Sequence, residues 1–441
     1  MARLSRHFAV SLAVSMGTLL VLAAFSFHSL RAQAPAGGTV AMTGARVIDG
    51  TGAQPLEKAT IVISNGRIEA VGAKVKIPAG ATRIDMSGKT IMPGIINAHG
   101  HLSFKFDDSL PARERLTRQL RVYADYGVTT VVVLGTGQGD LDDAVKLREE
   151  QGHGTLDRAR VYAAGPSLRN IKTAEEARSK VDAYADAKAD LIKMHITGSP
   201  EDTQPAVYKV LIDEAHKRGL RVAAHLFYIK DARGLLDAGG DVIAHSVRDQ
   251  DVDAPLIAEI KRRDVGYIPT LTRDLAIFVY ESKPAFFSDP FFLRQGNFYH
   301  NQIMQLSDPA QQEKTRNNKE AQSIKQALQQ ANRNLKTLSD AGVSIGLGTD
   351  SGINLGQWQG FFEHMELEMM VKAGLTPMQA LVIGTGGAAH VWRLEQNLGT
   401  IQAGKQADLL VLNANPLTDI RNTRQIDSIW IGGHRLAQAK D

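Results

Sequence analysis

Short apolar segments alternate with longer amphipathic segments through the middle of the chain. The longer segments repeat apolar residues at the 3.6-residue spacing of helices that lie on a sheet, as in 208–218 and 256–263. Eight strand-then-helix units predict an α/β fold, a closed (β/α)8 TIM barrel, whose functional site is built at the carboxyl ends of the strands. The short segments, each of strand length, are residues 91–97, 129–134, 160–164, 191–196, 221–226, 242–245, 266–271 and 344–348.

Both ends of the chain carry a different pattern, in which short strand-like segments are separated by turn residues. Asn65-Gly66 lies between two apolar runs and is typical of a two-residue β-hairpin. Similar segments occur close to the C-terminus. We therefore expect residues 37–90 and 391–441 to pair in one small composite β-sandwich domain, beside a barrel formed by residues 91–390.

The first residues have the three regions of a secretory signal: a basic head, an apolar stretch and a short segment of small residues. We expect residues 1–36 to be removed during export to the periplasm or the outside of the cell. The apolar stretch is long enough to span a bilayer, so an uncleaved anchor is the alternative, and only then would the protein contact a membrane. The chain has no cysteine, which excludes a lipidated cysteine, disulfides and thiolate ligands.

The net charge of +4 gives no argument for nucleic-acid binding. Three basic residues, Arg3, Arg6 and Arg31, lie in the predicted signal, which has no acidic residue, so the mature chain carries +1 (4 minus 3). So small a charge creates no global basic field. We expect a small-molecule substrate as the partner, and no nucleic acid.

Polar residues of metal-binding type stand where the predicted strands end. Two histidines at i and i+2 project from the same side of an extended chain and can hold one cation together. A bare His-x-His is more often a pair of loop residues, but here the other strand ends carry residues that can join it. Because the carboxyl ends of barrel strands meet, we expect one site. The six strand-end residues are His99, His101, Lys193, His225, His245 and Asp350.

Lys193 fits this set only if it is modified. Neutral imidazoles and carboxylates suit zinc and similar divalent ions, whereas a lysine ammonium repels them. A lysine at a strand end is usually solvated or ion-paired. If CO2 converts its amine to a carbamate, however, Lys193 becomes an anion with two oxygens that can bridge two cations roughly 3.5–4 Å apart.

These strand-end residues carry a family resemblance together with two further motifs. The motifs are Met92-Pro93-Gly94, ahead of the His-x-His pair, and the segment 399–409. The chain resembles the amidohydrolase superfamily, in its imidazolonepropionase-like and dipeptidase-like branch. The resemblance covers nearly all of the mature chain.

The resemblance implies two divalent metal ions, with zinc the expected metal. His99 and His101 would bind one ion and His225 and His245 the other, while the carboxylated lysine bridges the two. Asp350 would bind the first ion and act as general acid and base. A water activated to hydroxide by the ions would attack the substrate, and Asp350 would pass its proton to the leaving amine.

Further candidates follow from their positions near the expected ligands. His195 lies two residues beyond Lys193, on the same strand face, and is a candidate catalytic or substrate-binding residue; a packed structural histidine is the alternative. The family often has a histidine or tyrosine two residues after the fifth-strand ligand, but Phe227 stands there. Tyr228 follows as a candidate substrate contact, although strand alternation turns it the other way.

Two arginines are expected at the mouth of the site. Arg248 follows the sixth-strand ligand and Arg273 follows the seventh strand. Two guanidinium groups there could hold a substrate carboxylate. The alternative is that they pair with the neighbouring Asp249 and Asp274 and stiffen the rim.

A long insertion, residues 272–332, precedes the eighth strand and is rich in aromatic residues. Long insertions in compact domains are commonly functional, so this one could cover an apolar group of the substrate. A subunit interface in a homo-oligomer explains the aromatics almost as well. Its polar second half, residues 311–330, predicts an exposed helix.

Three functions are consistent with these features. The favoured one is an exported metal-dependent amidohydrolase that cleaves an amide-type C–N bond, in a dipeptide or an N-acyl amino acid. The second is a hydrolase or deaminase of a cyclic amide or amidine, although deaminases of this fold generally lack the lysine ligand. The third, a non-catalytic binding protein, is disfavoured because every expected ligand position is intact.

Overall fold

The computed structural model describes residues 38–104 and 109–437. These described residues belong to one compact unit, which holds all of the described strands and helices. The predicted secretory segment, residues 1–36, lies outside the described residues. Within the described ranges, no helix has both the length and the apolar character needed to cross a membrane.

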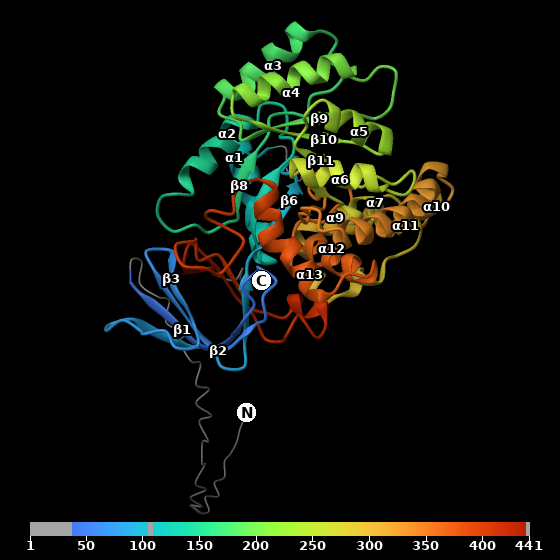
Figure 1. The fold of residues 1–441 in the computed structure, drawn as a ribbon. Helices are drawn as coiled ribbons and strands as arrows, with labels where there is room; N and C mark the ends of the chain where they lie inside the picture. The colour runs from blue at the N-terminus through green and yellow to red at the C-terminus, as the bar shows by residue number, and fades with distance from the viewer. Residues whose placement is uncertain (1–37, 105–108, 438–441) are drawn as a thin grey trace, which may run out of the picture. The chain divides into compact units, whose positions relative to one another are not determined.

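Strands from the two ends of the chain share one sheet, as predicted. The sheet has eight strands in the order β15-β14-β13-β5-β1-β2-β3, with β4 beside β1. Its central pairing is antiparallel, with Met92 of β5 opposite Leu410 of β13. Figure 1 shows the C-terminal segments in red beside the N-terminal strands in blue. The strands are β1 (Val40–Val47), β2 (Leu56–Ser64), β3 (Arg67–Gly72), β4 (Thr82–Asp85), β5 (Thr90–Pro93), β13 (Leu409–Leu412), β14 (Ile426–Ile431) and β15 (His434–Arg435).

The apolar segment predicted as the first barrel strand is divided between two sheets. β5 belongs to the eight-stranded sheet, whereas β6 (Ile95–Gly100) belongs to the barrel. Gly94 joins them, and a Cβ on this residue would come within 2.2 Å of the side chain of Thr129. Only glycine allows this close approach. The chain therefore passes from one sheet to the other within a single residue.

The barrel strands run parallel and close into a ring. β6, β7 and β8 form one sheet, and β9 to β12 form another. A parallel bridge between Ala164 and Leu191 joins the two sheets. On the other side Tyr267 bridges to Ile345, and the N–H of Ala98 donates to the carbonyl of Leu347 at 2.7 Å. The strands are β7 (Val128–Val133), β8 (Arg160–Ala163), β9 (Leu191–His195), β10 (Arg221–His225), β11 (Val242–Ala244) and β12 (Gly266–Ile268).

Two predicted strands are shorter in the structure. The eighth segment makes a single bridge at Ile345 instead of a continuous ladder. The seventh ends at Ile268, because Thr270 adopts a left-handed φ of 50° and α7 begins at Leu271. Both segments nevertheless place the residues that follow them at the end of the barrel where the other strands finish.

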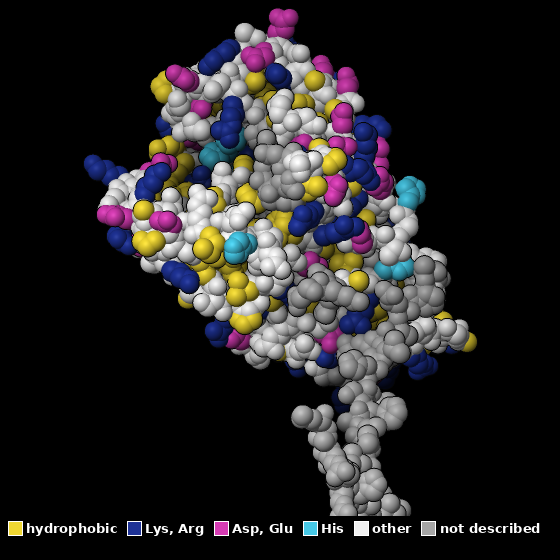
Figure 2. Space-filling view, turned by 180° about the vertical axis from the view of Figure 1, so that it is seen from behind, with side chains coloured by type: hydrophobic (Ala, Val, Ile, Leu, Met, Phe, Trp, Pro, Cys, Tyr) yellow, Lys and Arg dark blue, Asp and Glu magenta, His cyan; other side chains and the backbone are white. Residues whose placement is uncertain are grey.

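Helices surround the barrel strands (Figure 1). The apolar faces predicted from the sequence point inward; in α4, for example, Tyr208, Leu211, Ile212 and Ala215 are buried. Charged side chains of both signs are interspersed over the face in Figure 2. The helices outside the insertion are α1 (Ala112–Asp125), α2 (Leu141–Glu150), α3 (Ala174–Asp186), α4 (Pro205–Lys217), α5 (Ile229–Asp237), α6 (Ala254–Arg263), α12 (Phe361–Lys372), α13 (Pro377–Val382) and α14 (Ala388–Val391), with a π-turn at Ile383–Gly387 and a 3-10 turn at Ile420–Arg424.

The long insertion is helical, and its aromatic rings form a core of their own. Phe287, Phe292 and Tyr299 lie with ring centroids 5.8, 5.1 and 5.0 Å from Trp358. These rings are buried inside the chain, which corrects the expectation that they cover a substrate. The predicted exposed helix is confirmed for α10, while α11 buries one face. The elements are α7 (Leu271–Phe278), α8 (Pro290–Leu293), α9 (Gly296–Ser307), α10 (Pro309–Arg316) and α11 (Lys319–Asp340), with 3-10 turns at Val279–Glu281 and Ala285–Ser288.

Candidate metal centre and active site

The predicted ligands meet at the carboxyl end of the barrel. Each is positioned by the strand that precedes it, so the closure of the ring brings together residues far apart in the sequence. His99 lies in β6, Lys193 in β9 and His225 at the end of β10. His101, His245 and Asp350 directly follow their strand segments.

The first half of the site consists of His99, His101 and Asp350. The Nε2 atoms of the two histidines lie 3.0 and 2.9 Å from the same oxygen, Oδ1 of Asp350. The three side chains are buried, and their ligand atoms lie within 4.8 Å of one another. Among the described residues, this is the one group of three or more that meets the geometric requirements of a metal site.

The hydrogen bonding of His101 fits a metal ligand. Its Nδ1 lies 3.0 Å from the carbonyl oxygen of Gly135, which can only accept, so Nδ1 carries a proton. Its Nε2 faces Oδ1 of Asp350 at 2.9 Å, so a positive charge, either a proton or a metal ion, has to lie between the two atoms. Such a backbone contact also fixes the orientation of a metal-ligating ring.

His99 is held neutral, as a metal ligand must be. Burial lowers its pKa to about 3, and the positive charge of Lys193 adds to this effect. No hydrogen-bond partner is recorded for its Nδ1 among the described residues. The imidazole therefore has a free nitrogen lone pair at the pH of ordinary solutions.

The second half of the site lies against the first. The ring centroids of His225 and His245 are 4.4 Å apart, and those of His99 and His245 are 4.7 Å apart. Burial holds the pKa of both His225 and His245 well below the usual value, so these rings are neutral too. His245 has a φ of 74°, and its Nδ1 lies 2.7 Å from the hydroxyl of Thr270.

Lys193 lies at the centre of the site. Its Nζ is 3.4 Å from Nε2 of His99, and the residue is only 2% exposed. Burial lowers the pKa of Lys193 to about 7, although the charge of Asp350 opposes this shift. A large fraction of the amine is therefore unprotonated near neutral pH, which is the form that reacts with CO2.

A buried glutamate of α12 supports the first half of the site. Oε1 of Glu363 accepts hydrogen bonds from the side chains of Asn97, Thr349 and Ser351 at 2.5, 2.8 and 2.8 Å. Asn97 in turn accepts a hydrogen bond from the backbone N–H of His99 at 2.9 Å. Glu363 thus fixes the strand ends that carry His99 and Asp350.

A second glutamate of α12 supports the other half. Glu366 accepts from the backbone N–H groups of Leu271 and Thr272 at 2.8 and 2.7 Å. These residues directly follow Thr270, the hydrogen-bonding partner of His245. Sequence reasoning missed both glutamates, although acidic residues among phenylalanine, leucine and methionine on one helix were a signal for buried carboxylates.

His195 lies in the site, as predicted. Its ring stacks on that of His225, with centroids 4.5 Å apart, and its Nε2 lies 3.0 Å from Nη2 of Arg169. Burial lowers the pKa of His195 to about 2, with a contribution from the charges of Lys193 and Arg169. Arg169 follows the third barrel strand, and no motif in the sequence identified it.

The expectation for Arg248 is wrong. Its side chain is buried, with Nε 2.9 Å from Oδ2 of Asp274, and its guanidinium lies 4.4 Å from the centre of the Phe227 ring. Arg248 therefore forms a structural ion pair, which was the alternative. Asp274 is the partner, because Asp249 accepts instead from the backbone of Ile229.

Arg273 and Tyr228 remain candidates for substrate contacts. Arg273 pairs with Asp274 at 2.7 Å through Nη1, and its Nε lies 3.8 Å from Oδ2 of Asp350. Tyr228 is 38% exposed and lies at the start of α5, with Lys230 over its ring. The structure thus brings Arg273 to the metal ligands but records no polar contact between Tyr228 and them.

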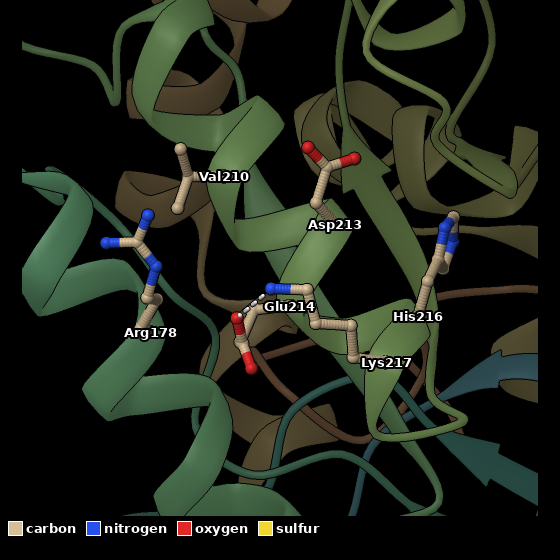
Figure 3. A pocket seen from close by; sticks show the side chains of 6 residues that line it. All are labelled: Arg178, Val210, Asp213, Glu214, His216 and Lys217. Atoms are coloured by element: carbon tan, nitrogen blue, oxygen red, sulfur yellow. Dashed lines mark hydrogen bonds and ion pairs between the residues drawn. The ribbon is translucent and has the colours of Figure 1, made fainter.

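The surface has hollows at several places. In Figure 2 histidine side chains lie recessed in a hollow in the upper part of this face, with basic side chains at its edge. A groove between α3 and α4 is different, because it lies on the outer helices and its Lys217 and Glu214 pair with each other at 2.9 Å. Figure 3 shows its lining residues, Arg178, Val210, Asp213, Glu214, His216 and Lys217.

Comparisons with known proteins agree with this geometry. The model of the amidohydrolase family matches residues 90–436. The ochratoxinase of Aspergillus niger is 25% identical over 88% of this chain and 84% of its own length. The crystal structure of a candidate prolidase from Bifidobacterium longum has a TM-score of 0.73 and 28% identity, over 91% of this chain and 95% of that one. A Xaa-Pro dipeptidase with bound methionine shares the fold, with a TM-score of 0.71 and 20% identity, over 90% and 99% of the two chains.

Proposed function

Because this chain belongs to the amidohydrolase family, we propose that it is a metal-dependent hydrolase of an amide-type carbon–nitrogen bond. The observation that carries the proposal is the convergence of His99, His101 and Asp350 on one point, with Lys193 and two further histidines beside them. Neutral imidazoles and a carboxylate are the donor set that zinc accepts.

Two divalent ions, zinc in the first place, would be held by the two halves of the site. His99, His101 and Asp350 would hold one ion, and His225 and His245 the other. Lys193 would join the halves as a carbamate: its neutral amine nitrogen bonds to the carbon of CO2 and releases one proton. When bound, such ions polarise the substrate carbonyl and make water a nucleophile near neutral pH.

We propose that Asp350 transfers the proton. Burial alone would raise its pKa, but the facing imidazoles of His99 and His101 hold the pKa of this carboxyl well below its usual range. It therefore starts ionised and can accept a proton from the attacking water. When the acyl carbon–nitrogen bond breaks, Asp350 returns that proton to the leaving nitrogen, which departs as an amine.

We propose a dipeptide or an N-acyl amino acid as the substrate. The similar structures include proteins named as a dipeptidase and as a candidate prolidase, and these names support an amide substrate with an amino-acid leaving group. Lys193 at the centre of the site argues against the deaminase alternative, because deaminases of this fold generally lack a lysine ligand.

We further propose that the enzyme works after export. Residues 1–36 have the composition of a secretory signal, and the absence of cysteine suits a protein that meets an oxidising compartment. The test is N-terminal sequencing of the protein recovered from the periplasm and the medium. A mature N-terminus near residue 36 is expected. A protein that keeps residue 1 in the membrane fraction would instead support the uncleaved anchor, and intact protein in the cytoplasm alone would contradict export.

The decisive experiment for the activity combines metal analysis with a substrate panel. The mature protein is reconstituted with excess zinc and bicarbonate, freed of loose metal and assayed on dipeptides, N-acyl amino acids, lactams, lactones and esters. We expect two ions per chain and hydrolysis of linear amides. At most one tightly held ion would contradict the two-metal site, and a fully loaded protein that cleaves no amide would contradict the hydrolase.

A further inference from the structure

Two of the arginines near the site have carboxylate partners. Arg248 and Arg273 both pair with Asp274, at 2.9 and 2.7 Å. A second carboxylate, Asp350, lies with Oδ2 3.8 Å from Nε of Arg273. The positive charges of Arg248 and Arg273 are therefore compensated.

Arg169 differs from these two arginines. Its side chain is exposed, and within the described part of the chain no carboxylate lies at ion-pair distance from it. Its recorded hydrogen bond runs from Nη2 to Nε2 of His195, at 3.0 Å. A guanidinium can only donate, so Nε2 accepts and His195 is neutral, with its proton on Nδ1. A neutral ring cannot balance the charge of Arg169, and its remaining N–H groups are free for another acceptor.

Arg169 lies beside the reacting centre. His195, which it contacts, stacks directly on His225, a predicted metal ligand. A group bound by Arg169 would therefore lie next to the bond that is cleaved.

We propose that Arg169 binds a free substrate carboxylate that lies next to the scissile nitrogen. In an amino-acid leaving group the carboxylate is two bonds from that nitrogen, and the planar fork of an arginine matches its two oxygens. The enzyme would then release the C-terminal amino acid of a dipeptide, or the free amino acid of an N-acyl amino acid, and would not cleave internal peptide bonds. This inference rests on the proposed hydrolase function.

Binding of inert ligands tests the carboxylate site without any turnover. Phenylalanine and phenylalaninol differ in the carboxylate, and neither has an amide to hydrolyse. Titration calorimetry on the zinc-loaded protein should show the acid binding roughly ten- to a hundredfold more tightly, as expected for a hydrogen-bonded ion pair. Arg169→Met should remove this preference and Arg169→Lys should keep part of it. Arg178→Met, which alters an exposed arginine of α3, is the matched control and should leave the preference unchanged.

Kinetic measurements distinguish the proposal that Arg169 binds a carboxylate from the proposal that the protein is a hydrolase. N-acetylphenylalanine and its C-terminal amide are compared in wild type and Arg169→Met. We expect a higher kcat/KM for the acid in the wild type, and a loss in Arg169→Met that appears mainly in KM. If acid and amide react equally, or if the preference survives in Arg169→Met, Arg169 does not read the carboxylate. If no amide is cleaved but binding still follows Arg169, the carboxylate site stands and the hydrolase proposal falls.

Discussion

The amine nitrogen of Lys193 lies 3.4 Å from Nε2 of His99, so the lysine faces an atom that is also predicted to bind a metal. An ammonium ion in this place would repel a cation, whereas a carbamate would attract one. Lys193→Ala should therefore lower both the metal content and the hydrolysis rate. Short carboxylic acids should restore part of each, because they can replace the carbamate oxygens. Full metal content in Lys193→Ala, measured by elemental analysis, would contradict the bridge.

Reconstitution should depend on pH in a direction set by the same lysine. Burial lowers the pKa of Lys193 to about 7, and only the unprotonated amine reacts with CO2. The unprotonated fraction rises with pH, so zinc uptake at constant dissolved CO2 should accelerate as the pH increases from about 6 to about 8. The measurement is the rate of activity recovery from the metal-free protein. A rate that is independent of both CO2 and pH would exclude the carbamate.

Asp350→Asn should separate metal binding from proton transfer. The amide oxygen can still approach a metal ion, so the variant should keep much of its metal. It cannot accept a proton from water, and kcat should fall by roughly 10²–10⁴-fold. Steady-state rates and metal content measured on the same sample test this. Turnover close to that of the wild type would exclude Asp350 as the general base.

Arg248→Met should destabilise the fold without changing substrate preference. Arg248 and Asp274 form a buried pair, and removal of one partner of such a pair typically costs about 3–5 kcal/mol. Because Arg273 still contacts Asp274, we expect the low end of this range. Denaturant unfolding measures the loss. A stable variant with a reduced preference for the carboxylate substrate would show that Arg248 does bind the substrate carboxylate.

Glu363→Ala should impair the site through the residues that it orients. Loss of its hydrogen bonds frees Asn97, Thr349 and Ser351, which hold the strand ends of His99 and Asp350. We expect metal affinity or kcat to fall by roughly 10–100-fold. Glu368→Ala is the matched control, because Glu368 lies on the same helix and pairs with Arg424, away from the site. Equal effects of the two substitutions on kcat would show that Glu363 has only a structural role.

The ligands could be predicted from the sequence because strand ends combine two local signals. An apolar segment indicates where a strand ends, and the type of the polar residue at that end indicates whether it can bind a metal ion. The barrel then brings these positions together whatever the details of packing. His99, His225 and Asp350 are each found in this way, without any knowledge of side-chain contacts.

The rest of the site depends on packing that the sequence does not display. Arg248 and Arg169 both follow barrel strands, yet one is buried against Asp274 and the other faces His195. Only the tertiary contacts distinguish them. Glu363 was missed because acidic residues are rarely fully buried, so a carboxylate within an apolar helix contradicts the usual pattern. The division of the first strand was missed for a different reason: an apolar run continues through it, although Pro93-Gly94 was a local signal of a break.

Because β5 pairs with β13, the eight-stranded sheet can form completely only after the C-terminal segment has been synthesised. β5 lies within the first hundred residues, whereas β13 begins at Leu409, so the nascent chain carries an unfinished sheet until almost all of it has been synthesised. During that time β5 exposes an unpaired edge, which must be protected from wrong partners. The joining of the two ends is therefore among the last steps of folding, and in an exported chain it would follow transport.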